Sequence, residues 1–367
     1  MDQFSADCMT IVEEKLAAGK IDRRQFLKVA ALFGAAGPTV LAGREAKAAT
    51  ELVFANWGGD ATTAFRQVYG TAFEKSSGIK VAFDTTGPSI GKIRAMVESK
   101  KVTWDVMDTT LATAGELGAA GLMEKIDYSI VDKNKVLPGY AQEYGVAGYG
   151  FSNVFTYDSS KFGGKKPNSW ADFWNLKDFP GKRSLRRDIA GTLEAALMAD
   201  GVPKDKLYPI DVPRAFKKIA EIKKDCVFWN SGAESQQFLR DGEAVMGTLW
   251  NTRGYLLAQD SKGRLATCWN EAIFQSNCWG VPKGNPGGKD VMRLIASMQE
   301  PAQQVEILKV LASGPANPAA AAIVPAELKS QNPSDPGNLA MAVQYDVKWY
   351  SENQQKVQQQ YLDFLAS

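Results

Sequence analysis

Apolar residues recur with two different periods along the part of the chain that follows residue 50. Short apolar runs at residues 52–55 and 79–83 are typical of buried strands. Between them, over residues 65–73, apolar side chains recur at helical spacing, and the same spacing predicts a helix over residues 90–97. A third strand is predicted at residues 104–107. Strands that alternate with helices in this way predict βαβ units around a mainly parallel sheet.

A second series of alternating elements begins near Asp158. Strands are predicted at residues 185–188, 227–229 and 245–249, and Pro213 suits the first turn of a helix between them. At 367 residues the chain is also too long for one ordinary domain. The fold class expected from both observations is α/β, with two lobes, each a mainly parallel sheet flanked by helices.

Polar and aromatic residues follow the ends of several predicted strands. Ligands bound to parallel sheets lie at the carboxyl ends of the strands, so these residues are expected along two rims. Trp57 and Trp250 each stand where a strand ends and polar residues begin. A wall of indole suits a ligand with an alkyl body and a cationic end, through cation–π attraction of roughly 0.5–2 kcal/mol per contact. The rim segments are Trp57, residues 85–89, residues 108–110 and residues 250–253.

One stretch, Ala272–Gly284, is apolar at both ends and polar in the middle, where Gln275, Ser276 and Asn277 stand. A strand with this pattern can be core at each end and face a cleft at its centre. The pattern suits a segment that passes from one lobe to the other, with its polar centre facing whatever is bound. An ordinary hairpin strand with a solvated middle is the alternative.

A glycine-rich stretch, residues 145–150, has its glycines in the wrong order for a dinucleotide-binding fingerprint. It predicts a flexible turn that enters a crossover. The sequence also lacks the GxxxxGK[ST] motif of a phosphate-binding loop. No cofactor is therefore expected.

Histidine is absent from the sequence. This absence excludes Ser-His-Asp and Cys-His catalysis, His-ligated zinc and a histidine general base, because each needs an imidazole. Catalysis by carboxylates, lysine or tyrosine remains open. The net charge of +2 predicts neither nucleic-acid binding nor a strongly acidic partner.

The amino terminus has the order of an export signal. An arginine pair within residues 23–28 is followed by a mildly apolar stretch, residues 29–41, and by a small-residue cleavage site at residues 46–48. The pair resembles a twin-arginine signal, although an aspartate replaces the usual serine or threonine before it. Residues 1–48 are therefore predicted to be a twin-arginine signal peptide, cleaved near Ala48, which places the mature protein in the periplasm. An amphipathic helix with a chance arginine pair is the alternative.

Removal of residues 1–48 leaves three cysteines, Cys226, Cys268 and Cys278. An odd number allows at most one disulfide and leaves at least one free thiol. Cys268 and Cys278 can pair only if their strands are neighbours, and three unpaired buried cysteines are equally compatible with the sequence. The cysteine spacing matches no metal-ligand motif, so no metal site is predicted.

Five short motifs stand out by their order and spacing: Asn56–Gly58 after the first strand, Trp104–Val106, Ser169–Asp172, Gly242–Val245 leading into Trp250–Asn251, and Trp279–Gly284. Together they resemble the periplasmic substrate-binding proteins of ABC transporters, in the group similar to spermidine/putrescine-binding proteins. The resemblance covers nearly all of the mature chain.

The resemblance implies a type II periplasmic binding protein, in which two lobes are joined by two crossing strands, here residues 154–157 and Ala272–Gly284. It implies that hinge closure traps a solute, which is then delivered to the permease subunits of an ABC transporter in the inner membrane. The implied lobes are residues 49–156 with 276–367, and residues 157–275. A monomer without enzymatic activity is expected.

The chain departs from the polyamine-binding relatives at the site itself. Those relatives place an aromatic residue and an acid in the second crossing strand, where they hold an ammonium group. The corresponding residues here are Gln275 and Asn277, and Gly191 stands where a further acid is expected. Loss of a charge-assisted partner for a buried ammonium costs on the order of 1.5–3 kcal/mol. Arg187 and Arg253 lie at the rims, where a guanidinium can hold a carboxylate in two parallel bonds; surface or interdomain ion-pair roles are the alternative.

The sequence therefore predicts a carrier for a polyamine, or for an amine that also bears a carboxylate, such as an amino-butyrate or an opine. Ferric-ion binding on the same fold usually takes paired tyrosines, and the sequence has no Tyr-Tyr pair. The alternative from another class is an exported enzyme that uses carboxylates such as Asp108 and Asp188. The candidate ligand-binding residues are Trp57, Gly58, Ser89, Thr109, Thr110, Asp188, Trp250, Asn251, Arg253, Gln275 and Asn277.

Overall fold

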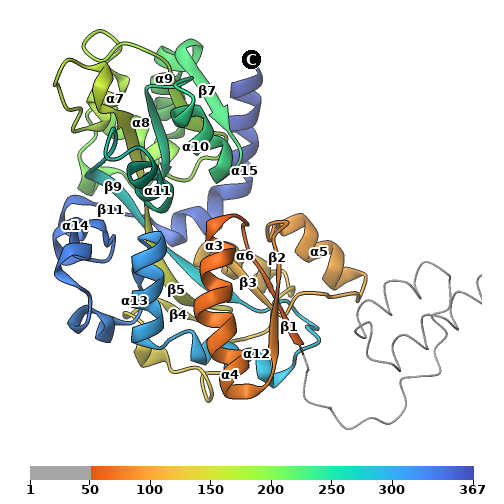
Figure 1. Ribbon diagram of the computed structural model, residues 1–367. Helices are drawn as coiled ribbons and strands as arrows, with labels where there is room; N and C mark the ends of the chain where they lie inside the picture. Colours follow the sequence, from red (N-terminus) through yellow and green to blue (C-terminus); the bar gives the residue numbers. More distant parts are fainter. Residues whose placement is uncertain (1–50) are drawn as a thin grey trace, which may run out of the picture. The chain divides into compact units, whose positions relative to one another are not determined.

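The structure is a computed structural model that describes residues 51–367, and the strands of this region form one continuous sheet (Figure 1). The segment predicted as a signal peptide, residues 1–48, lies outside the described residues. The eleven strands of the sheet are β1 (Glu51–Ala55), β2 (Lys80–Asp84), β3 (Val106–Thr110), β4 (Ala141–Gln142), β5 (Gly145–Asp158), β6 (Arg183–Arg186), β7 (Cys226–Trp229), β8 (Met246–Trp250), β9 (Leu265–Gly280), β10 (Gly314–Pro315) and β11 (Val343–Gln344).

The main path of the sheet has the order β2-β1-β3-β9-β5-β8-β6-β7. Both ends are parallel: β1 pairs with β2 and β3, and β6 pairs with β7 and β8. The centre is antiparallel, because β9 runs opposite to β3 and β5, and β5 runs opposite to β8. The two predicted βαβ series thus form the two ends, and the α/β fold class is confirmed.

Helices separate the parallel strands, as the periodicity predicts. Gly78 has a φ of 75° and ends the first helical stretch, and Ser169 accepts a hydrogen bond from the Asp172 amide as an N-cap. Within residues 51–367, no helix has the length and apolar character needed to cross a membrane. The helices are α3 (Asp60–Phe65), which continues through a π-helical turn (Arg66–Gly70) into α4 (Thr71–Ser77), α5 (Ile90–Glu98), α6 (Leu111–Ala119), α7 (Trp170–Trp174), α8 (Thr192–Ala199), α9 (Val212–Ile222), α10 (Gly232–Arg240), α11 (Asn251–Asp260), α12 (Lys289–Ser297), α13 (Pro301–Leu311), α14 (Pro336–Met341) and α15 (Val347–Ala366).

Two large hydrophobic clusters lie on the two ends of the sheet. One contains Phe54 and Trp279, whose rings meet edge to face with centroids 5.2 Å apart. The other contains Trp170 and residues of α8 and α9. The terminal helix α15, although it falls in the segment 276–367 predicted for the first lobe, contributes Tyr350 and Tyr361 to this second cluster. The predicted lobe boundaries themselves stay a prediction.

The glycine-rich stretch at residues 145–150 is a strand, and the prediction of a flexible turn is wrong. It forms the first part of β5. A Cβ on Gly148 would lie 2.2 Å from Cε2 of Trp279, and a Cβ on Gly150 would lie 2.8 Å from Cε2 of Phe274. Both aromatic residues belong to the neighbouring strand β9, so glycine here provides space for a ring that lies across the backbone.

The stretch Ala272–Gly284 is confirmed as a crossing strand through residue 280, because it belongs to β9 and pairs with β5 across the centre of the sheet (Figure 1). The other predicted crossing, residues 154–157, lies in β5. These two strands have 14 and 16 residues, which at about 3.3 Å per residue makes each roughly 50 Å long. Each strand is therefore long enough to extend from one parallel end of the sheet to the other.

The third strand begins two residues later than predicted and includes the rim. Residues 108–110 are the last residues of β3 and not a turn that follows it. Asp105 precedes the strand, and its carboxylate accepts hydrogen bonds from the amides of Val53 and Gly287. The apolar run did not predict where β3 ends, because the β-branched residues Thr109 and Thr110 extend the strand beyond the run.

The three cysteines of the described region are free. Cys268 and Cys278 lie on the same strand, ten residues apart. At about 3.3 Å per residue this separation is roughly 33 Å, whereas a disulfide needs Cα atoms within about 7 Å. The possible bridge between these two cysteines is thereby excluded.

Gly148→Ala is expected to lower the free energy of unfolding by about 1–3 kcal/mol, because the added methyl group would overlap the Trp279 ring. Gly115→Ala in α6 is the control. A Cβ at Gly115 would meet nothing within 4 Å, and alanine in place of glycine is expected to stabilise by about 0.4–1 kcal/mol. Urea unfolding measures both, and equal stabilities of the two variants would contradict the packing role of Gly148.

Candidate functional site

A cavity of about 230 Å³ lies where the carboxyl ends of the parallel strands meet the crossing strands. Residues from β3, β5, β8 and β9 line it, together with the segments that follow β1 and β6. Nine of the eleven predicted ligand-binding residues line this one cavity: Trp57, Ser89, Thr109, Thr110, Asp188, Trp250, Arg253, Gln275 and Asn277.

The other two predicted residues, Gly58 and Asn251, do not line the cavity. The amide of Gly58 donates to the side chain of Asn56, 3.0 Å away, within the turn after β1. Asn251 is buried: its Oδ1 accepts from the Ser152 amide at 2.8 Å, and its Nδ2 donates to the carbonyl of Ala312 at 2.7 Å. The side chain of Asn251 therefore joins α11 to β5 and to the end of α13.

The crossing strand β9 turns two amide side chains toward the cavity. Gln275 and Asn277 lie on the same face because alternate residues of a strand share a face. Asn277 donates to the hydroxyl of Tyr149 at 2.8 Å. The Nε2 of Gln275 is buried and has no hydrogen-bond partner among residues 51–367. A buried donor without a partner is costly, so this amide is available to a bound solute.

Asp108 is the buried carboxyl group of the cavity, with 1% of its surface exposed. The Tyr149 hydroxyl lies 3.2 Å from Oδ2 of Asp108, and the Asn56 amide also lies 3.2 Å from it. Burial raises the pKa of Asp108 well above its usual value, although the hydrogen bond from Tyr149 opposes this rise. Burial therefore disfavours the charged form of this carboxyl group when no cation is near it. From the sequence, Asp108 was expected on the rim and as a carboxylate of the enzyme alternative, but it was not among the predicted ligand-binding residues, and Tyr149 was missed.

Arg253 places a guanidinium at the cavity from the first turn of α11. Its Nη1 lies 3.4 Å from Oε1 of Gln236 and 3.9 Å from Oδ2 of Asp60. Burial lowers the pKa of Arg253, and the negative charge of Asp60 opposes this shift. The group is 9% exposed, so a cation stands in a largely dry environment with only a distant carboxylate.

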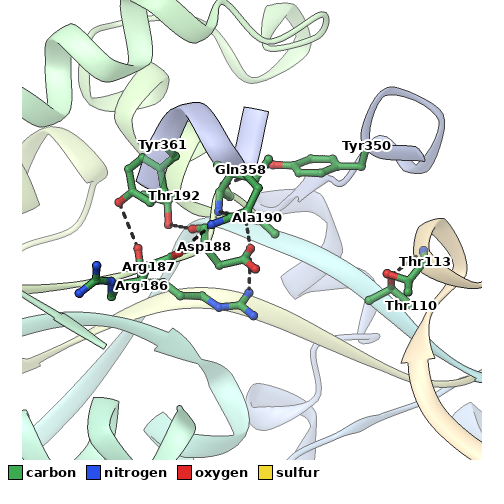
Figure 2. A network of polar contacts seen from close by, with 12 residues as sticks. Thr110, Thr113, Arg186, Arg187, Asp188, Ala190, Thr192, Tyr350, Gln358 and Tyr361 are labelled. Atoms are coloured by element: carbon green, nitrogen blue, oxygen red, sulfur yellow. Dashed lines mark hydrogen bonds and ion pairs between the residues drawn. The ribbon is translucent and has the colours of Figure 1, made fainter. Parts of the chain in front are cut away.

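The second guanidinium of the cavity belongs to Arg186 and not to Arg187, the residue singled out from the sequence. Arg186 lies over the ring of Trp250, with 5.1 Å between its guanidinium carbon and the ring centroid, and its Nη1 is 3.5 Å from Oδ1 of Asp188. Arg187 is exposed, and Figure 2 shows the two arginine side chains pointing in opposite directions. The reason is the pleat: neighbouring residues of an extended chain face opposite sides.

Aromatic rings form much of the remaining wall. Trp57 is half exposed, whereas Trp250 is largely buried, and Phe151 faces Gln275 across the paired strands β5 and β9. Sequence reasoning found only the two tryptophans. Tyr149 and Phe151 are two residues apart in β5, so their side chains lie on the same face of the strand. This period-two pattern of aromatic residues could have predicted that both line the cavity. Phe65, Phe151 and Tyr345 are the aromatic lining residues that the sequence missed in addition to Tyr149.

The arrangement can hold both charges of a small molecule. Two guanidinium groups, from Arg186 and Arg253, can donate to a carboxylate, and two carboxyl groups, from Asp108 and Asp188, can accept from an amine. Within residues 51–367, no group of three or more acidic or cysteine side chains is placed to hold a metal ion. The cavity is thus equipped to bind an organic ion.

Residues 69–336 match the family described as bacterial extracellular solute-binding protein. The Gamma-aminobutyric acid-binding protein of Pseudomonas aeruginosa is 34% identical over 316 residues, which cover 84% of this chain and 89% of that protein.

Solved structures agree with this match. The Atu4243–GABA receptor has a TM-score of 0.79 and 33% identity, over 86% of this chain and 98% of that chain. The binding protein AgtB from Agrobacterium tumefaciens R10, in complex with agropinic acid, has a TM-score of 0.80 and 30% identity, over 87% of this chain and 99% of that chain. Such relatives are substrate-binding proteins of ABC transporters and not enzymes, and they have two lobes. The chain belongs to the bacterial extracellular solute-binding protein family and is the solute-binding component of an ABC transporter.

Proposed function

We propose that the protein captures a small solute that carries both an amine and a carboxylate, such as γ-aminobutyrate. The strongest support is the charge pattern of the cavity, where Arg186 and Arg253 stand with Asp108 and Asp188. The volume of about 230 Å³ lies below the roughly 300–1,000 Å³ of sites for drug-sized ligands. A short amino acid fits this volume, with its carboxylate toward the guanidinium groups and its amine toward the carboxyl groups.

Two of the relatives support the same class of solute. One is named for gamma-aminobutyric acid, a second is described as a GABA receptor, and a third was solved with agropinic acid. A polyamine is less well supported for two reasons. Gln275 and Asn277 are uncharged, and a diamine has no group for the guanidiniums of Arg186 and Arg253 to bind. An opine, which is also an amine with a carboxylate, is the alternative within this class.

We also propose the remaining parts of the transport cycle. Residues 1–48 act as a twin-arginine signal peptide, so the mature protein begins near Ala49 and works in the periplasm as a monomer. Residues 49–156 with 276–367 form one lobe and residues 157–275 the other, and hinge closure between them traps the solute for the permease subunits. The arginine pair and the small-residue cleavage site support export, and the long shared strands β5 and β9 support a hinge.

The mature protein is expected to bind γ-aminobutyrate at micromolar concentration or tighter, about −8 kcal/mol. Putrescine lacks the carboxylate and butyrate lacks the amine, so each leaves polar groups of the cavity without a partner and is expected to bind at least about tenfold more weakly. Titration calorimetry measures all three. Putrescine binding as tight as that of γ-aminobutyrate would contradict the proposal, as would binding of agropinic acid alone. Recovery of chemically unchanged solute after denaturation would exclude the enzyme alternative.

Arg186→Met is expected to weaken γ-aminobutyrate binding by about tenfold or more, because it removes a guanidinium from the cavity wall. Arg187→Met is the matched control, since it removes the same charge at the next position from an exposed side chain. The control is expected to change the dissociation constant by less than about twofold. Titration calorimetry distinguishes the two, and equal losses would assign the effect to net charge and not to the cavity.

We further propose that Asp108 accepts a hydrogen bond from the solute amine. Burial keeps the pKa of Asp108 raised in the solute-free protein, whereas a bound ammonium would lower it, so binding would release a proton. The free protein then holds more protons than the complex, and affinity rises with pH until Asp108 ionises in the free protein.

Between about pH 5.5 and pH 8, where both charges of γ-aminobutyrate are constant, the dissociation constant is expected to fall by up to about tenfold per pH unit. Asp108→Asn is expected to remove this dependence, because an amide does not titrate. Calorimetry in two buffers with different ionisation enthalpies measures the released proton. A dissociation constant of the wild type that is independent of pH would rule out this role for Asp108.

A further inference from the structure

The terminal helix α15 presents a polar face to the loop that follows β6. Tyr350, Gln354, Gln358 and Tyr361 recur at helical spacing and therefore share one side of the helix. The loop, residues 187–191, leads from β6 to α8 and carries Asp188 to the cavity. The function of this glutamine-rich helix does not follow from its sequence.

Gln358 makes two hydrogen bonds to the loop backbone. Its Oε1 accepts from the amide of Ile189 at 3.0 Å, and its Nε2 donates to the carbonyl of Arg187 at 2.9 Å (Figure 2). One side-chain amide thus holds the peptide groups on both sides of Asp188. An amide side chain offers a donor and an acceptor side by side, as these two peptide groups require.

Two tyrosines of α15 support the same loop. The Tyr361 hydroxyl donates to the carbonyl of Arg186 at 3.1 Å, and the Tyr350 hydroxyl donates to Oε1 of Glu194 in α8 at 2.8 Å. The helix therefore contacts the chain before, within and after the loop. Gln354 of the same face lines the cavity itself.

We propose that Gln358 is a positioning residue for solute binding, which acts by holding the loop that presents Arg186 and Asp188 to the cavity. The carboxylate of Asp188 accepts from the amide of Ala190 at 2.9 Å and lies 3.5 Å from Arg186, so its direction depends on the backbone of the loop. Gln358 fixes that backbone from outside the cavity. The inference rests on the proposed function in one respect, namely that the solute contacts the pair formed by Arg186 and Asp188.

Gln358→Met removes both hydrogen bonds and keeps the length of the side chain. It is expected to weaken γ-aminobutyrate binding by about fivefold to tenfold, whereas Gln360→Met, at an exposed position of the same helix, changes it by less than about twofold. Urea unfolding verifies that each variant is folded.

A double-mutant cycle distinguishes positioning from a general structural effect. In an Arg186→Met background, Gln358→Met is expected to weaken binding by clearly less than it does in the wild type, because one of the two groups that it positions is already absent. Equal losses in both backgrounds would overturn the inference.

A measurement without solute decides the inference even if γ-aminobutyrate is the wrong probe. The nuclear magnetic resonance signal of the Arg186 Nε–H group reports the order of that side chain, and it is expected to show increased mobility in Gln358→Met but not in Gln360→Met. An unchanged signal would overturn the inference. Increased mobility together with no binding of γ-aminobutyrate to the wild type would instead reject the proposed solute and leave the role of Gln358 standing.

Discussion

The antiparallel pairing of β5 with β9 is the contact on which the rest of the structure depends. The path through the sheet from one parallel end to the other passes through this pair. Gly148 and Gly150 have no side chains to fill the space that the rings of Trp279 and Phe274 occupy, so the two backbones can approach while large aromatic residues pack across them. The same pairing turns Gln275 toward the cavity. The pairing of β5 with β9 therefore contributes both to the packing of the aromatic core and to the lining of the cavity.

Three arginines, Arg183 and Arg186 in β6 and Arg253 in α11, show that some cations are used within the fold and others face the cavity. Arg183 is fully buried and donates to three backbone carbonyls at 2.6–2.7 Å, so its hydrogen bonds are used within the fold. Arg186 and Arg253 have carboxylates at 3.5 and 3.9 Å, longer than the roughly 2.7–2.9 Å of a strong charge-assisted bond. A cation that is desolvated and incompletely paired in a preorganised cavity retains donors for a ligand. Such groups bind an anion without first breaking a strong internal bond.

Much of this architecture could be predicted from the sequence, because periodicity reports which face of an element is buried. The strand and helix series, the crossing strand and the cavity location of Gln275 and Asn277 all follow from apolar spacing and from the rule that sites lie at strand ends. The choice between Arg186 and Arg187 could not be predicted, because a shift of one residue in a strand boundary reverses the side on which a residue lies. The two hydrogen bonds of Gln358 could not be predicted either, because they join residues that are distant in the sequence.

The position of β5 and β9 in the chain has a consequence for the order of folding. Residues 159–264 lie between the two strands, so their pairing must close a very long loop. The entropy lost on closing a loop of this length is on the order of 4 kcal/mol, whereas the parallel strands and helices within the loop need far shorter closures. Contacts of high sequence separation form slowly for this reason. The contact that unites the finished protein is therefore expected to be among the last to form, after the segment that it encloses has become ordered.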